Sequence, residues 1–471
     1  MPGQTVKASG AERSTGPPAQ RGAMVLTALL GATLLGTLSN NILNVPLREI
    51  TRAFHAPLAS GVLVITSFVL VLAAAMAFTG WVGDRFGRRR TLICALTLMA
   101  VAQVGAALAP SLPVLIGLRA VQGLACAAIP PSVMGLLSTT YPSDQRARMM
   151  SAWAAANGVG QAVGPPLGGL VADLFGWRSI FWMLAPLALL ALLGVARGLP
   201  KDSGRASPLH WPGAICLTAG AALTMTAATT LPQHSVPIWV DVALAVAGVL
   251  LLALFALVSA RAEHPLIRPR LIVESRFLRS AVASFAQMFA LATVLVAVPL
   301  YITGEMGRTT AVTGLLVFAL PATMAVLAPG VGLLSDRTGP RRVLRVGLLV
   351  LAGASVGFGF FTDTDARGLA VLVALLIAVG VGVALVQTPS ATGATRSPAG
   401  QTGSALGLFN MMRFGGSALG TAWVAVVYPH GALLLLFSGA ALMLVIAVAA
   451  TYLGPDPLPY SAGSDRAITP A

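Results

Sequence analysis

The chain has 471 residues, of which 56% are hydrophobic and only 10% are charged, and its formal net charge is +15. This composition is too apolar for a soluble globular protein, so it predicts an integral membrane protein with many spanning helices. Loops that face anionic lipid account for the excess of positive charge, which leaves no need to invoke nucleic-acid binding. The three cysteines lie within apolar stretches and form neither a disulfide framework nor a metal-ligand spacing.

Apolar runs of about 19 to 25 residues predict about fourteen spanning helices. A polar segment rich in Pro and Gly, residues 1–23, precedes them, and we interpret it as a disordered cytoplasmic tail. The predicted helices cover residues 24–47, 59–82, 91–109, 113–137, 147–171, 179–197, 210–231, 238–260, 278–303, 311–334, 343–361, 367–389, 404–427 and 431–453. An even number of spans puts both termini on one side, and most Lys and Arg residues lie in loops on that side, which makes it cytoplasmic.

The polar side chains of the first predicted helix are amides and a hydroxyl group. Asn40 and Asn44 lie about one helical turn apart, with Ser39 beside them. An amide inside a membrane helix either hydrogen-bonds to a neighbouring helix or contacts a bound molecule, and the sequence leaves both alternatives open. We predict that Asn40 and Asn44 contribute to a substrate site.

An arginine-rich loop follows the second predicted helix. Its spaced pattern consists of Gly80, Asp84, Arg85, Gly87, Arg89, Arg90 and Leu92. A glycine in a membrane helix permits close packing, an aspartate can cap a helix end or pair with an arginine, and the arginines hold the loop at an anionic lipid surface. We predict that this loop takes part in conformational gating.

The fourth predicted helix contains a cation. Arg119 lies inside the apolar run and is followed by Gln122 and Gly123. A lipid-facing arginine near the membrane centre costs about 2.5 to 3.5 kcal/mol on insertion scales, so Arg119 is expected to face a cavity or a partner. The alternative is that its side chain reaches out to the external surface. We predict a coupling role for Arg119 and Gln122.

Glycines recur along the fifth predicted helix. Gly160, Gly164 and Gly168 share one helical face, and Pro165 removes a backbone donor and permits a bend. Close packing explains such a stripe by itself, and we additionally expect Gly164, Pro165 and Gly168 to serve a gating motion. Two amides on the same helix are further candidates for the substrate site, Asn157 and Gln161.

The second half of the chain repeats the loop pattern of the first half position for position. The second copy consists of Gly332, Asp336, Arg337, Gly339, Arg341, Arg342 and Leu344. Two unrelated basic loops would not share this spacing, so the repeat indicates a duplicated membrane bundle. We predict that the second copy of the loop also takes part in conformational gating. The remaining polar candidates for the substrate site are Gln287, Gln387, Asn410 and Arg413.

The repeated loop pattern resembles the signature loop between spans 2 and 3 of the major facilitator superfamily. Arg119, Gln122 and Gly123 resemble a span-4 motif of these transporters, and the glycines around Gly164 and Pro165 resemble the motif of their proton-linked exporters. A fourteen-span chain with a central helix pair is similar to the drug:proton antiporter family. This resemblance implies two bundles that rock about a central site, proton antiport and a monomeric protein.

Members of that family typically carry an aspartate in span 1 where this sequence has Ser39. Every Asp and Glu residue here falls in a loop, in a tail or near the end of a span. A proton carrier inside the bilayer needs a titratable side chain, so coupling is expected to use a carboxylate near a span end, with Asp84 as the first candidate. Without an acid to offset a cation, neutral or anionic amphipathic substrates are expected.

These observations predict an all-α membrane protein of the major facilitator fold, with two six-helix bundles and two inserted central helices. The expected segments are a tail over 1–23, bundles over 24–198 and 278–453, linkers with the inserted helices over 199–277, and a cytoplasmic tail over 454–471. We predict a plasma-membrane exporter of small amphipathic drugs or antibiotics. The alternatives are an uncoupled facilitator or flippase and a non-transporting membrane sensor.

No phosphate-binding loop, metal-ligand cluster or nucleophile arrangement is present in the sequence. We therefore predict a protein that is not an enzyme and that uses neither a cofactor nor a metal. Its expected partners are the small amphipathic substrate, protons and the lipid bilayer.

Overall fold

The computed structural model describes residues 19–43, 45–56, 58–142, 145–202, 204, 208–230, 237–360 and 366–454. These residues form helices joined by short connections and contain no β-strand. The helices of the first half are α1 (Ala19–Asn41), α2 (Leu47–Ala53), α3 (Leu58–Phe86), α4 (Arg88–Ala107), α5 (Leu112–Ala127), α6 (Ile129–Thr140), α7 (Arg146–Phe175) and α8 (Arg178–Gly198). The all-α fold predicted from the sequence is confirmed.

A helical hairpin and a second group of helices follow. They are α9 (Trp211–Thr230), α10 (Ile238–Arg261), α11 (Pro269–Ile272), α12 (Ser275–Gly304), α13 (Thr310–Val317), α14 (Ala319–Thr338), α15 (Pro340–Gly359), α16 (Ala366–Arg396), η3 (Ala399–Gln401), α17 (Gly403–Val427), η4 (Tyr428–His430) and α18 (Leu433–Ala450). The two terminal tails predicted from the sequence lie outside the described residues, except for 19–23 and 454. Residues 19–23 belong to α1, so the prediction that the disordered tail extends to residue 23 is wrong.

Twelve helical segments in the described part of the chain are long and apolar enough to cross a membrane. They do not include α7 and α17, although these helices contain 30 and 25 residues. Glycines and amides lower the hydropathy of both helices, because those side chains serve packing and polar contacts instead of lipid contact. A multi-pass membrane protein is thus confirmed, while the total of about fourteen spans stays a prediction.

Two of the spanning segments are broken helices. Ala128 separates α5 from α6 just before two prolines, and Phe318 separates α13 from α14 just before Pro321. A proline cannot donate the backbone hydrogen bond that would continue the helix, which explains a break at these positions. The short helices α2 and α11 were not predicted, because each is far too short to give a membrane-length apolar run.

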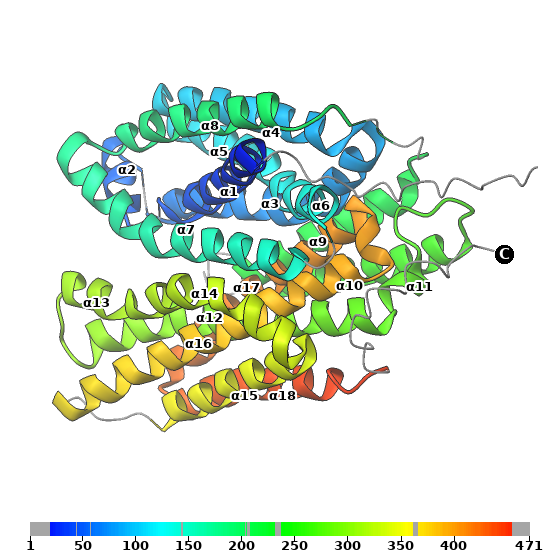
Figure 1. The fold of residues 1–471 in the computed structure, drawn as a ribbon. Coiled ribbons are helices and arrows are strands. Elements are labelled where there is room, and N and C mark those ends of the chain that lie inside the picture. Colours follow the sequence, from blue (N-terminus) through cyan, green and yellow to red (C-terminus); the bar gives the residue numbers. More distant parts are fainter. Residues whose placement is uncertain are drawn as a thin grey trace, which may run out of the picture.

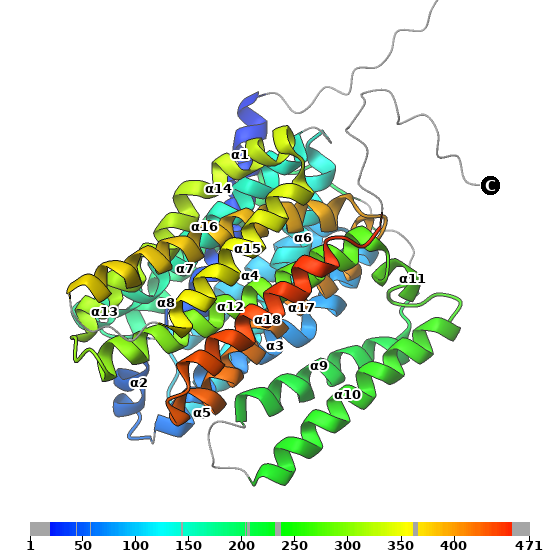
Figure 2. The same ribbon diagram turned by 90° about the horizontal axis from the view of Figure 1, so that it is seen from below.

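Helices α1 to α8 pack together on one side of the molecule and α12 to α18 on the other (Figure 1). The two groups meet along two surfaces. In the first seam α3 packs against α17, and in the second seam α7 packs against α14. The hairpin of α9 and α10 projects from one side of the molecule (Figure 2), with α9 against both α3 and α17. The hairpin therefore covers the first seam.

Candidate functional site

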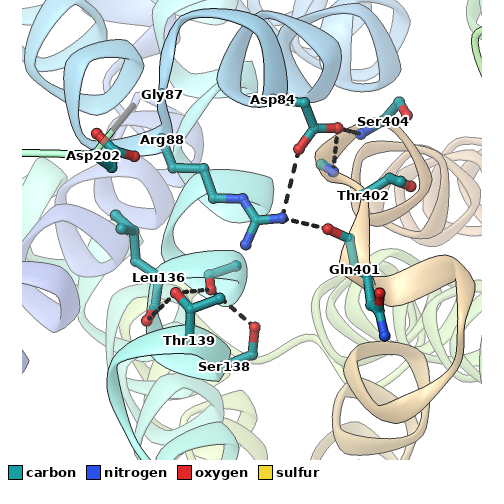
Figure 3. A network of polar contacts seen from close by, with 12 residues as sticks. Asp84, Gly87, Arg88, Leu136, Ser138, Thr139, Asp202, Gln401, Thr402 and Ser404 are labelled. Carbon is teal, nitrogen blue, oxygen red and sulfur yellow. Dashed lines mark hydrogen bonds and ion pairs between the residues drawn. The ribbon is translucent and has the colours of Figure 1, made fainter. Parts of the chain in front are cut away.

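Asp84 crosses the first seam from the end of α3. Its carboxylate accepts hydrogen bonds from the backbone N–H groups of Gly403, at 2.6 Å, and Ser404, at 3.3 Å, at the start of α17 (Figure 3). The first N–H groups of a helix have no partner within the helix, and its N-terminus carries a partial positive charge. An ionised Asp84 therefore caps a helix of the opposite helix group, as the loop pattern led us to expect.

Arg88 completes this contact, although it was not among the predicted residues. Its guanidinium lies 3.5 Å from the carboxylate of Asp84 and donates to the carbonyl oxygen of Gln401 at 2.8 Å (Figure 3). Pro340 occupies the corresponding position of the second copy, so the repeat gave no reason to single out Arg88. The run of consecutive arginines was the only signal available.

Gly80 brings the two backbones of the first seam together. A Cβ atom placed on Gly80 would lie 2.0 Å from the carbonyl oxygen of Gly403, and one on Gly407 would lie 2.2 Å from that of Met76. Neither position can hold a side chain without moving a main chain. The close approach predicted for Gly80 is confirmed, and it places the capping carboxylate of Asp84 within reach of α17.

The other residues of the first loop pattern stay within the first helix group. The backbone N–H of Arg89 donates to Asp202 and its guanidinium donates to the carbonyl oxygen of Ala196, near the end of α8. Gly87 has φ = 96°, and a Cβ there would meet Asp202. Arg85 is exposed. These residues fix the loop in place, whereas Asp84 and Arg88 link it to the second helix group.

The second copy of the pattern is used differently at the seam. A Cβ on Gly332 would lie 2.3 Å from the hydroxyl oxygen of Ser151, which is a side-chain atom, and Asp336 and Arg337 are exposed. Gly339 repeats the positive φ of the first copy, at 91°. Arg341 donates to carbonyl oxygens at the end of α18, just as Arg89 does at α8. The duplicated residues thus keep the same loop geometry, but they make different contacts at the two seams.

Arg119 is almost fully buried, with 1% of its surface exposed. It donates to the carbonyl oxygens of Val64 and Ser39, at 3.1 and 3.0 Å, and to the side chain of Gln122 at 2.7 Å. The ring of Phe68 lies 4.2 Å from the guanidinium carbon. The side chain therefore turns into the helix group, and the alternative in which it extends to the surface is wrong.

Ser39 takes part in the same network through its hydroxyl group. Gln103 donates to the Ser39 hydroxyl at 3.1 Å and accepts from Gln122 at 3.1 Å. No carboxylate contacts Arg119 among the described residues. Neutral oxygens and one aromatic ring thus stabilise a buried cation, and one guanidinium nitrogen of Arg119, Nη2, still has no hydrogen-bond partner among the described residues.

Arg413 is a second buried cation, and it lies on α17 between the two helix groups. Its guanidinium donates to the side chain of Asn410 at 2.9 Å and lies 5.0 Å from the ring of Trp153 on α7. Asn410 donates in turn to the sulfur of Met134 on α6. The indole N–H of Trp153 finds no hydrogen-bond partner in the described part of the chain. The cluster thus joins α17 to two helices of the first group and offers hydrogen-bond donors without an acid.

The amides of α12 and α16 lie at one level of the second helix group. Ser284 donates to Ser390 at 2.9 Å, and Gln287 and Gln387 follow one turn further along these antiparallel helices. Both are buried, yet both polar atoms of Gln287 and the amide nitrogen of Gln387 lack partners among the described residues. A buried polar group without a partner costs about 1 to 3 kcal/mol, so these amides favour any molecule that can pair with them.

The other predicted amides are spread over α1 and α7. Asn157 donates to the carbonyl oxygen of Trp153 at 3.0 Å, which is a bond within its own helix. The buried side-chain oxygen of Asn40 has no partner in the described residues, Gln161 is half-buried, and Asn44 lies outside them. The structure therefore groups the predicted substrate-site residues into separate clusters.

The glycine stripe of α7 faces α1 within the first helix group. A Cβ on Gly168 would lie 1.9 Å from the carbonyl oxygen of Ile42, and one on Gly164 would lie 3.2 Å from Cβ of Asn41. α7 runs as one helix through Pro165. The second seam uses another face of α7, with Ser151 and Gly158 against α14. Close packing is confirmed, but the partner is α1 and not the opposite helix group.

Comparisons with known proteins agree with this geometry. The family profile "Major Facilitator Superfamily" matches residues 29–421. The chain is 29% identical to multidrug resistance protein Stp of Mycobacterium tuberculosis, over 83% of this chain and 74% of that protein. It is 32% identical to puromycin resistance protein pur8 of Streptomyces alboniger, over 70% and 66% of the two chains.

A solved structure supports the same fold. The human organic anion transporter MFSD10 superposes with a TM-score of 0.68 at 17% sequence identity, over 92% of this chain and all of that chain. At this identity the likeness extends to the fold alone. The profile match agrees with the duplicated loop and the two packed helix groups. The chain therefore belongs to the major facilitator superfamily and is a transporter, not an enzyme.

Proposed function

We propose that the protein is a secondary active exporter of small amphipathic drugs or antibiotics, linked to protons and working by alternating access. Two relatives support the substrate class, since their names record multidrug and puromycin resistance. We further propose a plasma-membrane location with cytoplasmic termini, because the arginine-rich loops all lie on the side of the termini. A monomeric protein is proposed from the resemblance to the family. The two bundles are proposed to comprise residues 24–198 and 278–453.

The observation that carries this proposal is the Asp84 contact at the first seam. A charged cap on a helix of the opposite bundle stabilises only the arrangement in which the two bundles touch at their cytoplasmic ends. Opening that end must separate Asp84 from Gly403, since both lie at the seam. The contact is thus a switch between two states, which alternating access requires.

We place substrate recognition at the two donor-rich clusters, with Asn410 and Arg413 in one and Gln287 and Gln387 in the other. Asn40, Asn157 and Gln161 are secondary candidates. Every Asp or Glu residue in the described spans lies within the first or last turn of its helix, so a bound cation would find no counter-charge at mid-span. Neutral and anionic amphiphiles are therefore the proposed substrates.

Proton coupling is proposed to use carboxylates near helix ends. Asp84 is the first candidate because it faces the seam, and Asp241 and Glu305 are the others. Ser39 lies beside Arg119 where related exporters carry an acid, so the coupling step of this protein is expected to differ. A new carboxylate in Ser39→Asp would pair first with Arg119, which limits its attraction for a cationic substrate.

Whole-cell efflux tests the proposal. Cells that express the protein are loaded with matched anionic, neutral and quaternary ammonium dyes, and export is followed with and without a protonophore. The proposal predicts energy-dependent export that prefers the anionic and neutral dyes. Export that survives the protonophore indicates the uncoupled facilitator, and absence of export at normal abundance indicates the sensor. Strong export of quaternary ammonium dyes contradicts the proposed selectivity.

A further inference from the structure

A groove of about 660 Å³ runs between α1 and α7 and is closed at one side by Pro329 of α14. Its walls are almost entirely apolar, and the exceptions are Thr27 and Arg148. The lining comprises Leu26, Thr27, Leu30, Gly31, Leu34, Arg148, Met149, Ala152, Ala155, Ala156, Val159 and Pro329. This volume is typical of pockets that hold a drug-sized molecule.

The groove faces the bilayer. Its α7 wall includes Val159, which is 37% exposed, and the same face of the helix continues through Val163 and Leu170, exposed by 37% and 58%. The opposite face of α7 points inward and holds the buried residues Met150 and Ala154. An exposed apolar face of a membrane helix contacts lipid, so a molecule dissolved in the membrane can reach the groove directly.

One cation stands at the cytoplasmic end of the groove. Arg148 is exposed in the first turn of α7, and among the described residues it makes no hydrogen bond or ion pair. From Arg148 to Val159 the α7 wall extends roughly 16 Å at about 1.5 Å per residue. The groove thus pairs a headgroup-level positive charge with an apolar channel long enough for an acyl chain or a fused ring system.

The groove also has room for an occupant. A Cβ placed on Gly31, which lies in the middle of the α1 wall, would meet no atom within 4 Å. A second groove of about 390 Å³ follows the other side of α1 and shares Thr27, Gly31 and Leu34 with the first. On its membrane side, helix α1 is therefore not fully covered by neighbouring helices in the cytoplasmic half of the bilayer.

We propose that this groove is the membrane-side binding site for amphipathic monoanions, with a carboxylate on Arg148 and the apolar body along α1 and α7. This inference rests on the proposed export function and names the substrate class and its entry side. The single cation fits one negative charge, and the volume fits one drug-sized apolar body. The covered first seam offers no equivalent entry, because α9 lies across it.

Binding to the purified full-length protein in nanodiscs of neutral phosphatidylcholine tests the site. The probes are a fluorescent long-chain fatty acid and the alcohol and amine with the same chain and dye. Arg148→Gln is expected to weaken binding of the carboxylate about fivefold, as for one arginine near a membrane surface, and to leave the alcohol unchanged. Gly31→Leu fills the groove and is expected to weaken the acid and the alcohol roughly tenfold.

Matched controls separate local from general effects. Gly353→Leu makes the same change at an exposed glycine of α15 that also has open space around it, and Arg261→Gln removes an exposed arginine at the end of α10. Neither control should alter binding. Carboxylate binding that survives both groove variants overturns the proposal. Equal displacement of the fatty acid by phosphatidylglycerol vesicles overturns it too, because the groove would then be a general lipid site.

The same variants in the efflux assay separate this inference from the proposed function. If the parent protein exports none of the dyes, the export function fails, while the binding result still stands on its own. If the parent exports an anionic dye and Gly31→Leu does so at the same rate and abundance, the groove is not its route. The expected result is a drop of roughly tenfold with normal abundance, because the Cβ of the new leucine meets no atom within 4 Å and its branched end extends into the open groove instead of into packed protein.

Discussion

The two seams between the bundles are built from corresponding residues but differ in how tightly they close. At the first seam, Gly80 and Gly407 bring the main chains of α3 and α17 into direct contact, Asp84 caps α17, and α9 covers the outside. At the second seam the approach is looser: a Cβ on Gly332 would first meet the side chain of Ser151, one on Gly158 would meet no atom closer than 3.4 Å, and the membrane side carries an open groove.

This difference shows how an inserted hairpin changes a duplicated fold. Covering one seam removes it from the lipid, which permits charged groups such as Asp84 and Arg88 to lie there. The other seam keeps a lipid-facing apolar surface. We infer that the first seam holds the conformational switch and that the second seam is the side on which substrates enter.

The largest expected effect comes from the seam glycines. Gly80→Ala places a methyl group against the main chain of α17, which costs about 3 kcal/mol or more because a backbone cannot rotate away. Gly332→Ala meets first the hydroxyl of Ser151, a side chain that can rotate, and then the carbonyl oxygen of Ala147 at 3.1 Å, so it should cost less than Gly80→Ala, about 1 kcal/mol. Thermal unfolding and transport at equal abundance measure both. Equal losses would mean that the seams are equivalent.

Asp84→Asn removes the charge from the contact at the first seam. The amide keeps one acceptor but loses the charge that faces the α17 N-terminus and Arg88, so transport should fall roughly tenfold while membrane abundance changes little. Asp336→Asn is the matched variant at the second seam, where the side chain is exposed. Its transport rate should fall by less than about twofold. Unchanged transport by Asp84→Asn would reduce the loop pattern to a topology signal.

Gly164→Leu tests whether α7 must stay packed on α1. The larger side chain meets Asn41 and should abolish efflux, whereas Val163→Leu points to lipid on the same helix and should have almost no effect. Purified protein yield separates a folding defect from a transport defect. Normal export by both variants would show that the α1–α7 contact does not affect the second seam.

The smallest expected effect concerns the cover of the first seam. Thr230 donates to the buried carboxylate of Asp241 at 2.6 Å and so ties the end of α9 to the start of α10. Thr230→Val removes a bond that contributes about 1 kcal/mol, so transport should fall by less than about half. The amide hydrogens of α9 should exchange faster in the Thr230→Val variant than in the parent protein, while the exchange rates of α8 stay the same and serve as the internal reference. Unchanged exchange would show that this bond does not hold the cover.

The sequence by itself determined the helical membrane architecture, the duplicated plan and the close approach at Gly80. These features are local, since membrane-length apolar runs and a repeated loop follow from the solvent and from residue spacing along the chain. The tertiary structure alone decided which residues meet. Arg88 and not Arg85 crosses the seam, the Gly164 stripe faces α1, and Arg119 turns inward. A helical period gives the face of a residue but not the helix that will occupy it, because that choice depends on packing between segments far apart in the chain.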